Sequence, residues 1–537
     1  MAIAEYDYVI VGGGSAGCVL AGRLSEDPHV TVCLIEAGSR GDSWLTRIPG
    51  AIFITVPTRL HNWAFETVPQ AGLNGRKGYQ PRGKVLGGSS AINAMMYARG
   101  HRADYDHWAS LGNPGWSFES VLPYFKRSEH NTSHQNDLHG QGGPLHVTEL
   151  QRPSTLLDVF IAAAATQNIP YNPDINGVQQ HGVGITQVTQ KKGERHSAYS
   201  AYLKDHVGRP NLKVITHAIV DRVMCEDQVA VGVQYETPGQ VVQVRARREV
   251  LLSGGAYGSP QVLLRSGIGP AEALIDLDIP VVCDRPGVGE NLQDHIDLIE
   301  AVRTDTNTDT IGISVRGAWK MTYGLWQWWR HKKGALTSNY AEGIGFAYSD
   351  PQVQQPDLEL IFLPGLEDDH NRRLHWGHGY SCHVSVLRPK SRGSVRLANK
   401  DTAAAPLIDP QYLSHPDDLD LMVKGWHLQH ALLASEPFDP YRRAALYPVD
   451  ANDPEAVIAD IRNRSDTQYH PVGTCKMGPA DDLMAVVDSR LRVHGVKRLR
   501  VVDASIMPTL ISGNTNAPTM MIAEKAVDMI LEDQSAT

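Results

Sequence analysis

The first 36 residues carry apolar positions in the order of a β–α–β unit. Residues 8–11 form an apolar run, residues 16–24 place small and apolar side chains at helical spacing, and residues 31–35 are apolar and β-branched. A glycine-rich turn separates the first run from the helical segment. Because two parallel strands are joined by a helix that covers the sheet, this pattern predicts a parallel, helix-covered sheet at the start of the chain.

Similar strand patterns return far along the chain, and a region with a different pattern of hydrophobic and polar residues lies between them. Apolar, β-branched runs occupy residues 212–216, 241–252 and 498–503, and a helical pattern covers residues 519–530. Residues 296–455 instead hold several short alternating strands, many prolines and an aromatic run. We therefore expect an α/β protein with a Rossmann-like nucleotide-binding domain assembled from discontinuous segments, and an inserted α+β substrate domain with an antiparallel sheet. The nucleotide-binding domain is assigned to residues 1–155, 206–295 and 461–537, and the substrate domain to residues 156–205 and 296–460.

Composition narrows the class of protein. A chain of 537 residues is long for one core, which agrees with two domains. The net charge of −9 argues against a nucleic-acid partner, because neutralising phosphates requires a basic surface. The six cysteines are scattered without a CxxC pair, so neither a disulfide framework nor a zinc site is predicted. The scattered cysteines fit a reducing, cytoplasmic compartment, and no signal peptide and no apolar stretch near the ~20 residues of a membrane span are seen.

The glycine-rich turn has the spacing of a dinucleotide-binding motif. Gly12, Gly14 and Gly17 satisfy GxGxxG between a predicted strand and a predicted helix, so backbone amides at the helix start face a pyrophosphate. Glu36 ends the second strand, close to the ~20-residue spacing of the carboxylate that binds ribose hydroxyls. The motif alone does not separate FAD from NAD. No second GxGxxG unit follows, which favours a flavin that is not reoxidised by a nicotinamide nucleotide.

A second glycine-rich loop carries a specific resemblance. Consecutive glycines and serines in residues 83–93 offer backbone amides to a cofactor. This loop resembles the first signature of the glucose–methanol–choline (GMC) oxidoreductase family, and residues 255–269 resemble the second. The N-terminal loop, residues 287–295 and the C-terminal region match in the same order, so the resemblance covers essentially the whole chain. It implies an FAD-dependent enzyme that oxidises alcohols.

The resemblance also implies how FAD is held. Several members bind FAD covalently through a histidine in the second glycine loop, and Ile92 stands at that position here, so non-covalent FAD is expected. The residues implied for the cofactor are Gly12, Gly14, Ser15, Ala16, Gly17, Glu36, Ala37, Leu86, Gly88, Ser89, Asn93, Ala94, Met95, Met96, Val220, Asp503, Ala504, Asn514 and Thr515.

Two polar residues are implied for catalysis. The family places a histidine at the position of His470 and a histidine or asparagine at that of Asn514. An imidazole with an unperturbed pKa near ~6.5 takes up the hydroxyl proton at neutral pH, while the hydride goes to flavin N5. Asn514 orients the substrate oxygen without adding charge. A lone histidine beside a proline is more often structural, so the assignment of His470 rests on the resemblance.

The substrate and the electron acceptor are less specified. The strongest resemblance is to bacterial alcohol dehydrogenases that oxidise primary medium-chain aliphatic or polyether alcohols and pass electrons to a quinone or cytochrome. Choline dehydrogenases share many of the same stretches, and Glu342 is a candidate carboxylate for a quaternary ammonium. Aryl-alcohol or furan-alcohol oxidases that use O2 are a further alternative. A lyase that cleaves cyanohydrins remains as a different class, distinguished by the absence of flavin bleaching.

Two further segments have competing interpretations. His370, His375, His378, Cys382 and His383 match no closed zinc spacing, so a mobile loop without metal is predicted. Residues 319–333 combine tryptophans with a basic run. Such a segment is typical of docking at a membrane interface, here peripherally on the inner membrane, or of a helix packed in the substrate domain or at a dimer contact.

Overall fold

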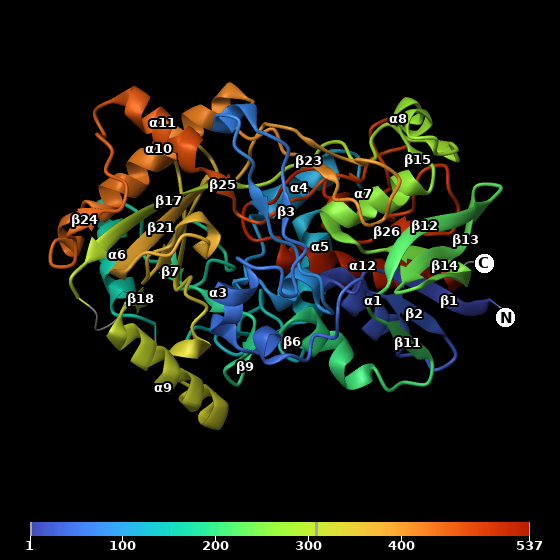
Figure 1. Ribbon diagram of the computed structural model, residues 1–537, viewed down its shortest axis with the longest axis horizontal. Helices are drawn as coiled ribbons and strands as arrows, with labels where there is room; N and C mark the ends of the chain where they lie inside the picture. Colours follow the sequence, from blue (N-terminus) through green and yellow to red (C-terminus); the bar gives the residue numbers. More distant parts are fainter. Residues whose placement is uncertain (1–2, 152, 307–309, 536–537) are drawn as a thin grey trace.

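The computed structural model describes residues 3–151, 153–306 and 310–535. Figure 1 shows two sheets side by side, one on the right near both termini and one on the left, with long loops between them. None of the helices in the described ranges is long and apolar enough to cross a membrane. The α/β class, with an antiparallel second sheet, is confirmed.

The sheet on the right contains the predicted β–α–β unit. Its central strand β1 is parallel to both β2 and β14, and the antiparallel strands β13 and β12 extend it on one side. Five predicted runs, from the first 36 residues to residue 503, therefore meet in one sheet. Its strands are β1 (Ala4–Val11), β2 (Val32–Ile35), β11 (Leu212–Ile215), β12 (Ile219–Glu226), β13 (Val229–Thr237), β14 (Gln240–Leu252) and β26 (Leu499–Val501).

Helix α1 (Ser15–Leu24) is buried along almost its whole length, because it lies between this sheet and α12 (Asn516–Ser535). The two helices are joined at their N-terminal ends by a hydrogen bond from Ser15 Oγ to Asn516 Oδ1 of 2.8 Å. A helix that is apolar on all sides is typical of a fully covered position. The last helix of the chain therefore fixes the start of α1, where the first glycine motif lies.

The second sheet is antiparallel and covered by helices on one face. Its order is β24-β17-β21-β20-β19-β7, with β18 and β25 paired at its sides. Its strands are β7 (Gly182–Ile185), β17 (Ile296–Thr304), β18 (Gly312–Ile313), β19 (Gly343–Ala347), β20 (Leu358–Leu363), β21 (Gly377–Val386), β24 (Ala444–Ala445) and β25 (Asp466–Thr467). The covering helices are α6 (Leu156–Thr166), α10 (Pro416–Leu433) and α11 (Pro454–Arg464).

The side chains of β20 alternate between the two faces of this sheet. Leu358, Leu360 and Phe362 pack into the helix-covered core, whereas Ile361 and Leu363 belong to the wall of the cavity between the sheets. The sheet thus supplies one wall of the site. The exact domain boundaries at residues 155, 205, 295 and 460 stay a prediction.

The expectation of a mobile loop at residues 370–383 is wrong for its second half. Strand β21 runs through the centre of the sheet, and Cys382 and His383 on it are buried. The polar histidines obscured the alternation of the strand in the sequence. Another segment, the π-helical turn Tyr199–Leu203, packs against α1.

Candidate active site

A cavity of about 1030 Å³ lies between the two sheets. It begins at the carboxyl ends of β1, β2 and β14, where Gly12, Glu36 and Ser253 line it. In parallel α/β sheets, ligands bind at this edge of the strands. The volume is at the upper end of the ~300–1,000 Å³ typical of ligand pockets, as a dinucleotide requires.

The first glycine loop is built so that its backbone faces this cavity. Gly12 has φ +95°, and a Cβ there would lie 2.5 Å from the Ser253 carbonyl oxygen. Both oxygens of Glu36 accept backbone hydrogen bonds, from Gly13 N at 2.8 Å and Gly38 N at 2.7 Å. Burial raises the pKa of Glu36 to about 7. Each carboxyl oxygen has a second lone pair, so Glu36 retains acceptor capacity for ribose hydroxyls.

The second glycine loop lies directly against the first. A Cβ on Gly88 would lie 2.7 Å from Gly14 Cα, so the two loops can approach only as glycines. Ile92 lines the cavity, and the Asn93 Oδ1 atom accepts a hydrogen bond from Arg195 Nη1 at 2.8 Å. The two loops therefore form one continuous backbone surface with the properties of a pyrophosphate cradle.

Most of the residues predicted to contact the cofactor line this cavity. Two do not. Gly17 packs against the Gly12 carbonyl, to which a Cβ would come within 1.9 Å, and Leu86 is fully buried beside Gly13. Both support the glycine loop from behind, and their contact with the cofactor stays a prediction. Those that line the cavity are Gly12, Gly14, Ser15, Ala16, Glu36, Ala37, Gly88, Ser89, Asn93, Ala94, Met95, Met96, Val220, Asp503, Ala504, Asn514 and Thr515.

His470 and Asn514 also line the cavity and contact each other. The distance from His470 Nε2 to Asn514 Nδ2 is 3.1 Å. On the other side of the ring, His470 Nδ1 lies 2.8 Å from Nδ1 of His295, a fully buried histidine. His295 Nε2 lies 3.0 Å from the carbonyl oxygen of Leu387. The three side chains thus form a continuous hydrogen-bonded chain.

The direction of this chain fixes the tautomers of both histidines. The Leu387 carbonyl oxygen only accepts, so His295 Nε2 carries the hydrogen and His295 Nδ1 is an acceptor. His470 Nδ1 must then donate, which leaves Nε2 of His470 without a proton. Both rings are neutral, because burial lowers the pKa of His295 to about 4, and burial together with His295 and Arg82 lowers that of His470 well below its usual range. The unprotonated nitrogen of His470 is therefore the one next to Asn514.

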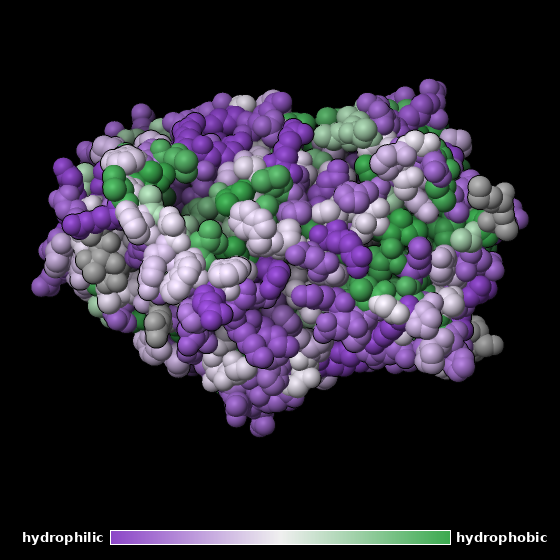
Figure 2. Space-filling view, turned by 60° about the horizontal axis from the view of Figure 1, so that its bottom comes forward, coloured by the Kyte–Doolittle hydropathy of each residue, from purple (hydrophilic) through white to green (hydrophobic). Residues whose placement is uncertain are grey.

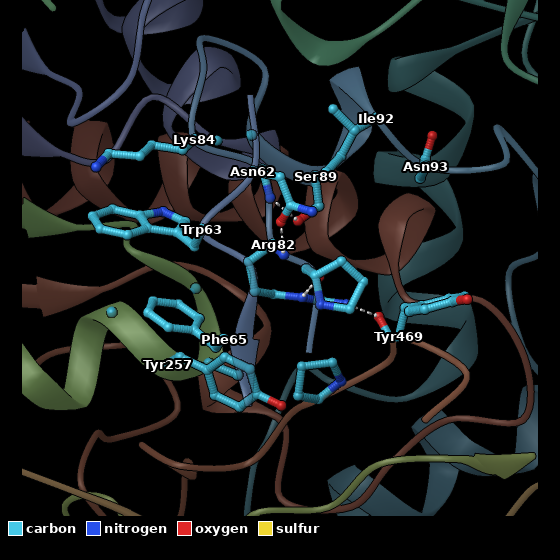
Figure 3. A pocket seen from close by; sticks show the side chains of 18 of the residues that line it. Asn62, Trp63, Phe65, Arg82, Lys84, Ser89, Ile92, Asn93, Tyr257 and Tyr469 are labelled. Carbon is cyan, nitrogen blue, oxygen red and sulfur yellow. Dashed lines mark hydrogen bonds between the residues drawn. The ribbon is translucent and has the colours of Figure 1, made fainter. Parts of the chain in front are cut away.

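The backbone around His470 is held on both sides. The preceding residue, Tyr469, has φ +72°, a left-handed conformation that is costly for a bulky side chain. Arg82 Nη2 donates to the Tyr469 carbonyl oxygen at 2.7 Å, as the dashed line in Figure 3 shows. His470 N donates to Asp294 Oδ1 at 2.8 Å. These bonds stabilise the turn that directs the imidazole to the cavity.

An aromatic wall in the same cavity was not predicted. In Figure 3, Trp63, Phe65 and Tyr257 lie one after another beside Arg82. Trp63 and Phe65 are stacked with ring centroids 5.4 Å apart, and the Lys84 ammonium lies 4.0 Å from the Trp63 ring centroid. Residues 62–65 contributed to the family resemblance, but no local pattern indicated that they face a site.

The histidine cluster at residues 370–383 is distributed among separate partners. His370 bonds to Tyr469, His375 to Asp368, and His378 to Thr310 and Ser314, whereas His383 pairs with Asp297.

Glu342, the candidate carboxylate for choline, is not among the residues that line the cavity. Its carboxylate accepts hydrogen bonds from Ser154 N at 2.6 Å and Ser338 Oγ at 2.8 Å. The expectation that it faces a bound cation is therefore not supported by its position.

The two-sheet fold and the cavity between glycine loops and a neutral histidine define a dinucleotide-dependent oxidoreductase. Comparison with known proteins agrees. Family models for GMC oxidoreductases match residues 6–297 and 389–523. The chain is 44% identical over 530 residues to an alcohol dehydrogenase [acceptor] of Pseudomonas putida, covering 98% of this chain and 96% of that protein. It is 41% identical to the mitochondrial choline dehydrogenase of Mus musculus, covering 99% of this chain and 91% of the relative.

Solved structures give the same result. The fold matches the crystal structure of pyridoxine 4-oxidase from Mesorbium loti with a TM-score of 0.86 and 30% sequence identity, covering 97% of this chain and 98% of that one. The chain belongs to the GMC oxidoreductase family. It is thus an FAD-dependent oxidoreductase that acts on alcohols or choline, as the resemblance implied.

Proposed function

We propose that the protein oxidises a primary alcohol to an aldehyde with non-covalently bound FAD, and passes the electrons to a quinone or cytochrome-type acceptor. The observation that carries this proposal is the chain Leu387–His295–His470–Asn514, which leaves an unprotonated nitrogen on His470 at the cavity surface. When bound, FAD supplies the hydride acceptor. The amides of the two glycine loops and the Glu36 carboxylate would hold it, and Ile92 offers no nucleophile for a covalent bond.

The protein residues divide the work of the proton and the oxygen. The alcohol hydroxyl binds on the cavity side of His470 Nε2 and Asn514 Nδ2, which lie 3.1 Å apart, so that its oxygen is within reach of both. Nε2 accepts the hydroxyl proton, and the Asn514 amide donates to the oxygen, so the alkoxide character develops next to a fixed donor. The proton that His470 already holds stays on Nδ1, which donates a hydrogen bond to His295 Nδ1.

The relatives support an alcohol and, as the alternative, choline. The P. putida relative is named an alcohol dehydrogenase [acceptor], which fits the apolar side chains Met95, Ile361 and Leu363 in the cavity wall. The choline alternative follows from the mitochondrial relative, but Glu342 is occupied by other hydrogen bonds and Lys84 covers the Trp63 ring. An aryl-alcohol or furan-alcohol oxidase remains the second alternative.

A substrate panel tests this proposal. The flavin-loaded enzyme is mixed anaerobically with 1-octanol, benzyl alcohol or choline, and the loss of flavin absorbance is followed; the reduced enzyme is then exposed to O2 or to a soluble quinone. We expect 1-octanol to bleach the flavin fastest and the quinone to reoxidise it faster than O2. If only choline bleaches the flavin, the substrate is choline and not an aliphatic alcohol. If none of the three compounds bleaches the flavin, a lyase is favoured.

We also propose that α9 (Val315–His331) docks this enzyme on an anionic membrane surface, where such an acceptor resides. Trp319 and Trp329 are 75% and 71% exposed, and Trp326 and Tyr323 are more than half exposed. Arg330 and Lys333 follow on the exposed end of this segment, which gives the aromatic face a positive border. In Figure 2, this side of the molecule, turned forward, shows pale and green side chains among purple ones. Aromatic residues with adjacent cations are typical of interfacial helices.

The helix also lies next to the cavity wall. Trp328, on its buried side, packs with Ile48, Ala51 and Leu336, and the Tyr340 hydroxyl, from a residue that lines the cavity, lies 3.9 Å from Met321 Sδ. Docking through α9 would therefore bring the cavity close to the lipid phase, from which a lipophilic alcohol or quinone enters.

Cosedimentation with vesicles tests the docking surface. The protein should bind phosphatidylcholine vesicles that contain phosphatidylglycerol, and bind less in high salt. Replacement of Trp319, Trp326 and Trp329 by serine should abolish binding, whereas Leu483→Ser, which removes a 71% exposed side chain elsewhere, should not. The wild-type protein could instead stay in the supernatant and elute as a dimer in size-exclusion chromatography. If the triple change then converts this dimer to a monomer, α9 contacts a second copy of the chain and not a membrane.

A further inference from the structure

A buried glutamate lies behind the catalytic histidine on the neighbouring sheet. Glu359, on β20, is fully buried, and neither of its carboxyl oxygens makes a hydrogen bond of normal geometry among the described residues. The neighbouring side chain of Gln468, also buried and without a hydrogen bond of normal geometry, is the polar group that faces it and lowers its pKa. The strand register places it opposite Ser385 of β21, which in turn pairs with Asp297 of β17. Buried polar groups are nearly always hydrogen-bonded, so a buried carboxyl without a hydrogen bond of normal geometry calls for an explanation.

The carboxyl of Glu359 faces the two histidines of the catalytic chain. One oxygen of Glu359 and one nitrogen each of His295 and His470 all lie within 4.8 Å of one another. At such distances, an opposite charge shifts the protonation of a group by about 1–3 pKa units. Glu359 is thus close enough to change how readily His470 takes up a proton, although it does not line the cavity.

Two other ionisable groups, Asp297 and His383, shift the pKa of Glu359 and are paired with each other. Asp297 of β17 is paired with His383 of β21, which also approaches Glu367 at 3.5 Å. Around His470, the charge of Arg82 opposes protonation of the ring, and His295 is neutral. Asp294, whose Oδ1 accepts the hydrogen bond from His470 N, is a second carboxyl group beside the ring. Burial raises the pKa of Asp294 only to about 6, so a gain in basicity near pH 8 is expected from Glu359 and not from Asp294.

We propose that Glu359 is a positioning residue whose ionised carboxylate stabilises the imidazolium formed on His470 during alcohol oxidation. The inference rests on the proposed role of His470 as the base. In the step, the alcohol O–H bond breaks and its proton moves to His470 Nε2, while the C–H bond breaks and its hydride leaves for the bound FAD. Glu359 gains and loses no proton in this step. It supplies the counter-charge, which is worth more in a buried site than in water.

The charge state of Glu359 makes the effect dependent on pH. Burial and the neighbouring Asp297 raise the pKa of Glu359 to about 8. Below that pH the carboxyl is neutral and gives His470 no assistance. Above it the carboxylate is present and the base becomes stronger. The rate of flavin reduction should therefore rise with pH through about 8 in the wild-type enzyme.

Glu359→Gln tests the proposal, because the amide has the same shape and never ionises. In the flavin-loaded enzyme, anaerobic flavin reduction is measured from pH 6 to 9.5. We expect the variant to equal the wild type at pH 6, where Glu359 is already neutral, and to fall behind by about tenfold or more at pH 9.5. A loss that is equal at every pH would mean a packing role, and an unchanged rise through pH 8 would assign the rise to another group; either result overturns the proposal.

Glu300→Gln is the matched control. Glu300 is also a buried glutamate of the same sheet, but it lies on β17 next to His430 of α10, away from the catalytic chain. Its replacement should leave the pH profile unchanged. His470→Gln separates this proposal from the one on which it rests. If that variant reduces flavin at the wild-type rate, the role of His470 fails; if it is slow while Glu359→Gln keeps the wild-type profile, only the role of Glu359 fails.

Discussion

Two buried histidines in the wall of one cavity have opposite protonation states. His470 bonds to a neutral imidazole and a neutral amide, and its pKa lies well below the usual range. Burial also lowers the pKa of His383, but the carboxylates of Asp297 and Glu367 outweigh burial and raise it to about 10. Burial is common to both. The partners of the ring nitrogens, which are neutral groups on His470 and carboxylates on His383, leave the first ring neutral and the second protonated.

This contrast gives each histidine a separate role. A neutral ring with a free nitrogen is what proton abstraction from an alcohol requires. A protonated ring between two carboxylates holds neighbouring strands together, since Asp297 is on β17 and His383 on β21. Changes at the two positions should therefore affect different properties of the protein.

The largest effect is expected from His470→Ala. Because the variant lacks the proposed base, flavin reduction by alcohol should slow by about 10²–10⁴-fold in a folded, yellow protein. Anaerobic stopped-flow absorbance measures this rate. His378→Ala, which removes a histidine bonded to Thr310 and Ser314, should reduce flavin at the wild-type rate. A slow His378 variant would indicate that any histidine loss disturbs the domain.

Asp297→Asn should affect stability. It leaves the buried His383 without its main carboxylate partner, which should lower the free energy of unfolding by about 3–5 kcal/mol. Chemical denaturation at pH 7 measures the loss. Ser385→Ala, which removes only a 2.9 Å hydrogen bond to Asp297, should cost about 1 kcal/mol.

The same pair predicts a dependence of stability on pH. The pKa of His383 is higher in the folded protein, about 10, than the ~6.5 of an unfolded chain, so its stabilisation is complete below pH ~6.5 and is lost as the pH rises through about 10. Asp297→Asn should remove this contribution to the slope. A variant whose melting temperature falls with pH as steeply as that of the wild type would contradict the pairing.

His295→Leu should slow flavin reduction less than His470→Ala does. It removes the acceptor for His470 Nδ1–H, so the ring no longer prefers the tautomer with a free Nε2. We expect flavin reduction to slow by about tenfold, with a changed pH profile. His295→Gln provides an acceptor oxygen and should restore most of the rate. Equal rates in the leucine variant and the wild type would remove His295 from the account.

The parts of the site that depend on local geometry could be predicted from the sequence. The first glycine loop follows from residues 12–17 and the strand and helix on either side, because three glycines at fixed spacing permit the turn and the close helix–strand packing. The class of protein and the pair His470 and Asn514 followed from family resemblance. The α/β arrangement is confirmed, whereas the cofactor and catalytic contacts stay predictions that the cavity supports.

The buried groups around His470 and the aromatic wall depend on contacts between distant residues, which no local sequence pattern predicts. His295 and His470 are 175 positions apart, and Glu359 reaches them only through the register of the antiparallel sheet. The aromatic wall likewise combines Trp63 and Phe65 with Tyr257, which is far along the chain. The histidines near residue 383 look like a polar loop, because the sequence does not show that His383 pairs with Asp297 of another strand or that His378 bonds to Thr310 and Ser314.

Nitrogen-15 NMR of the flavin-loaded protein with labelled histidines tests the central claim most directly. His470→Gln and His383→Gln assign the two resonance pairs. At pH 7 we predict that His470 is neutral with the proton on Nδ1, while His383 carries protons on both nitrogens. A His470 ring that is doubly protonated at pH 7, or that carries its single proton on Nε2, would contradict the account.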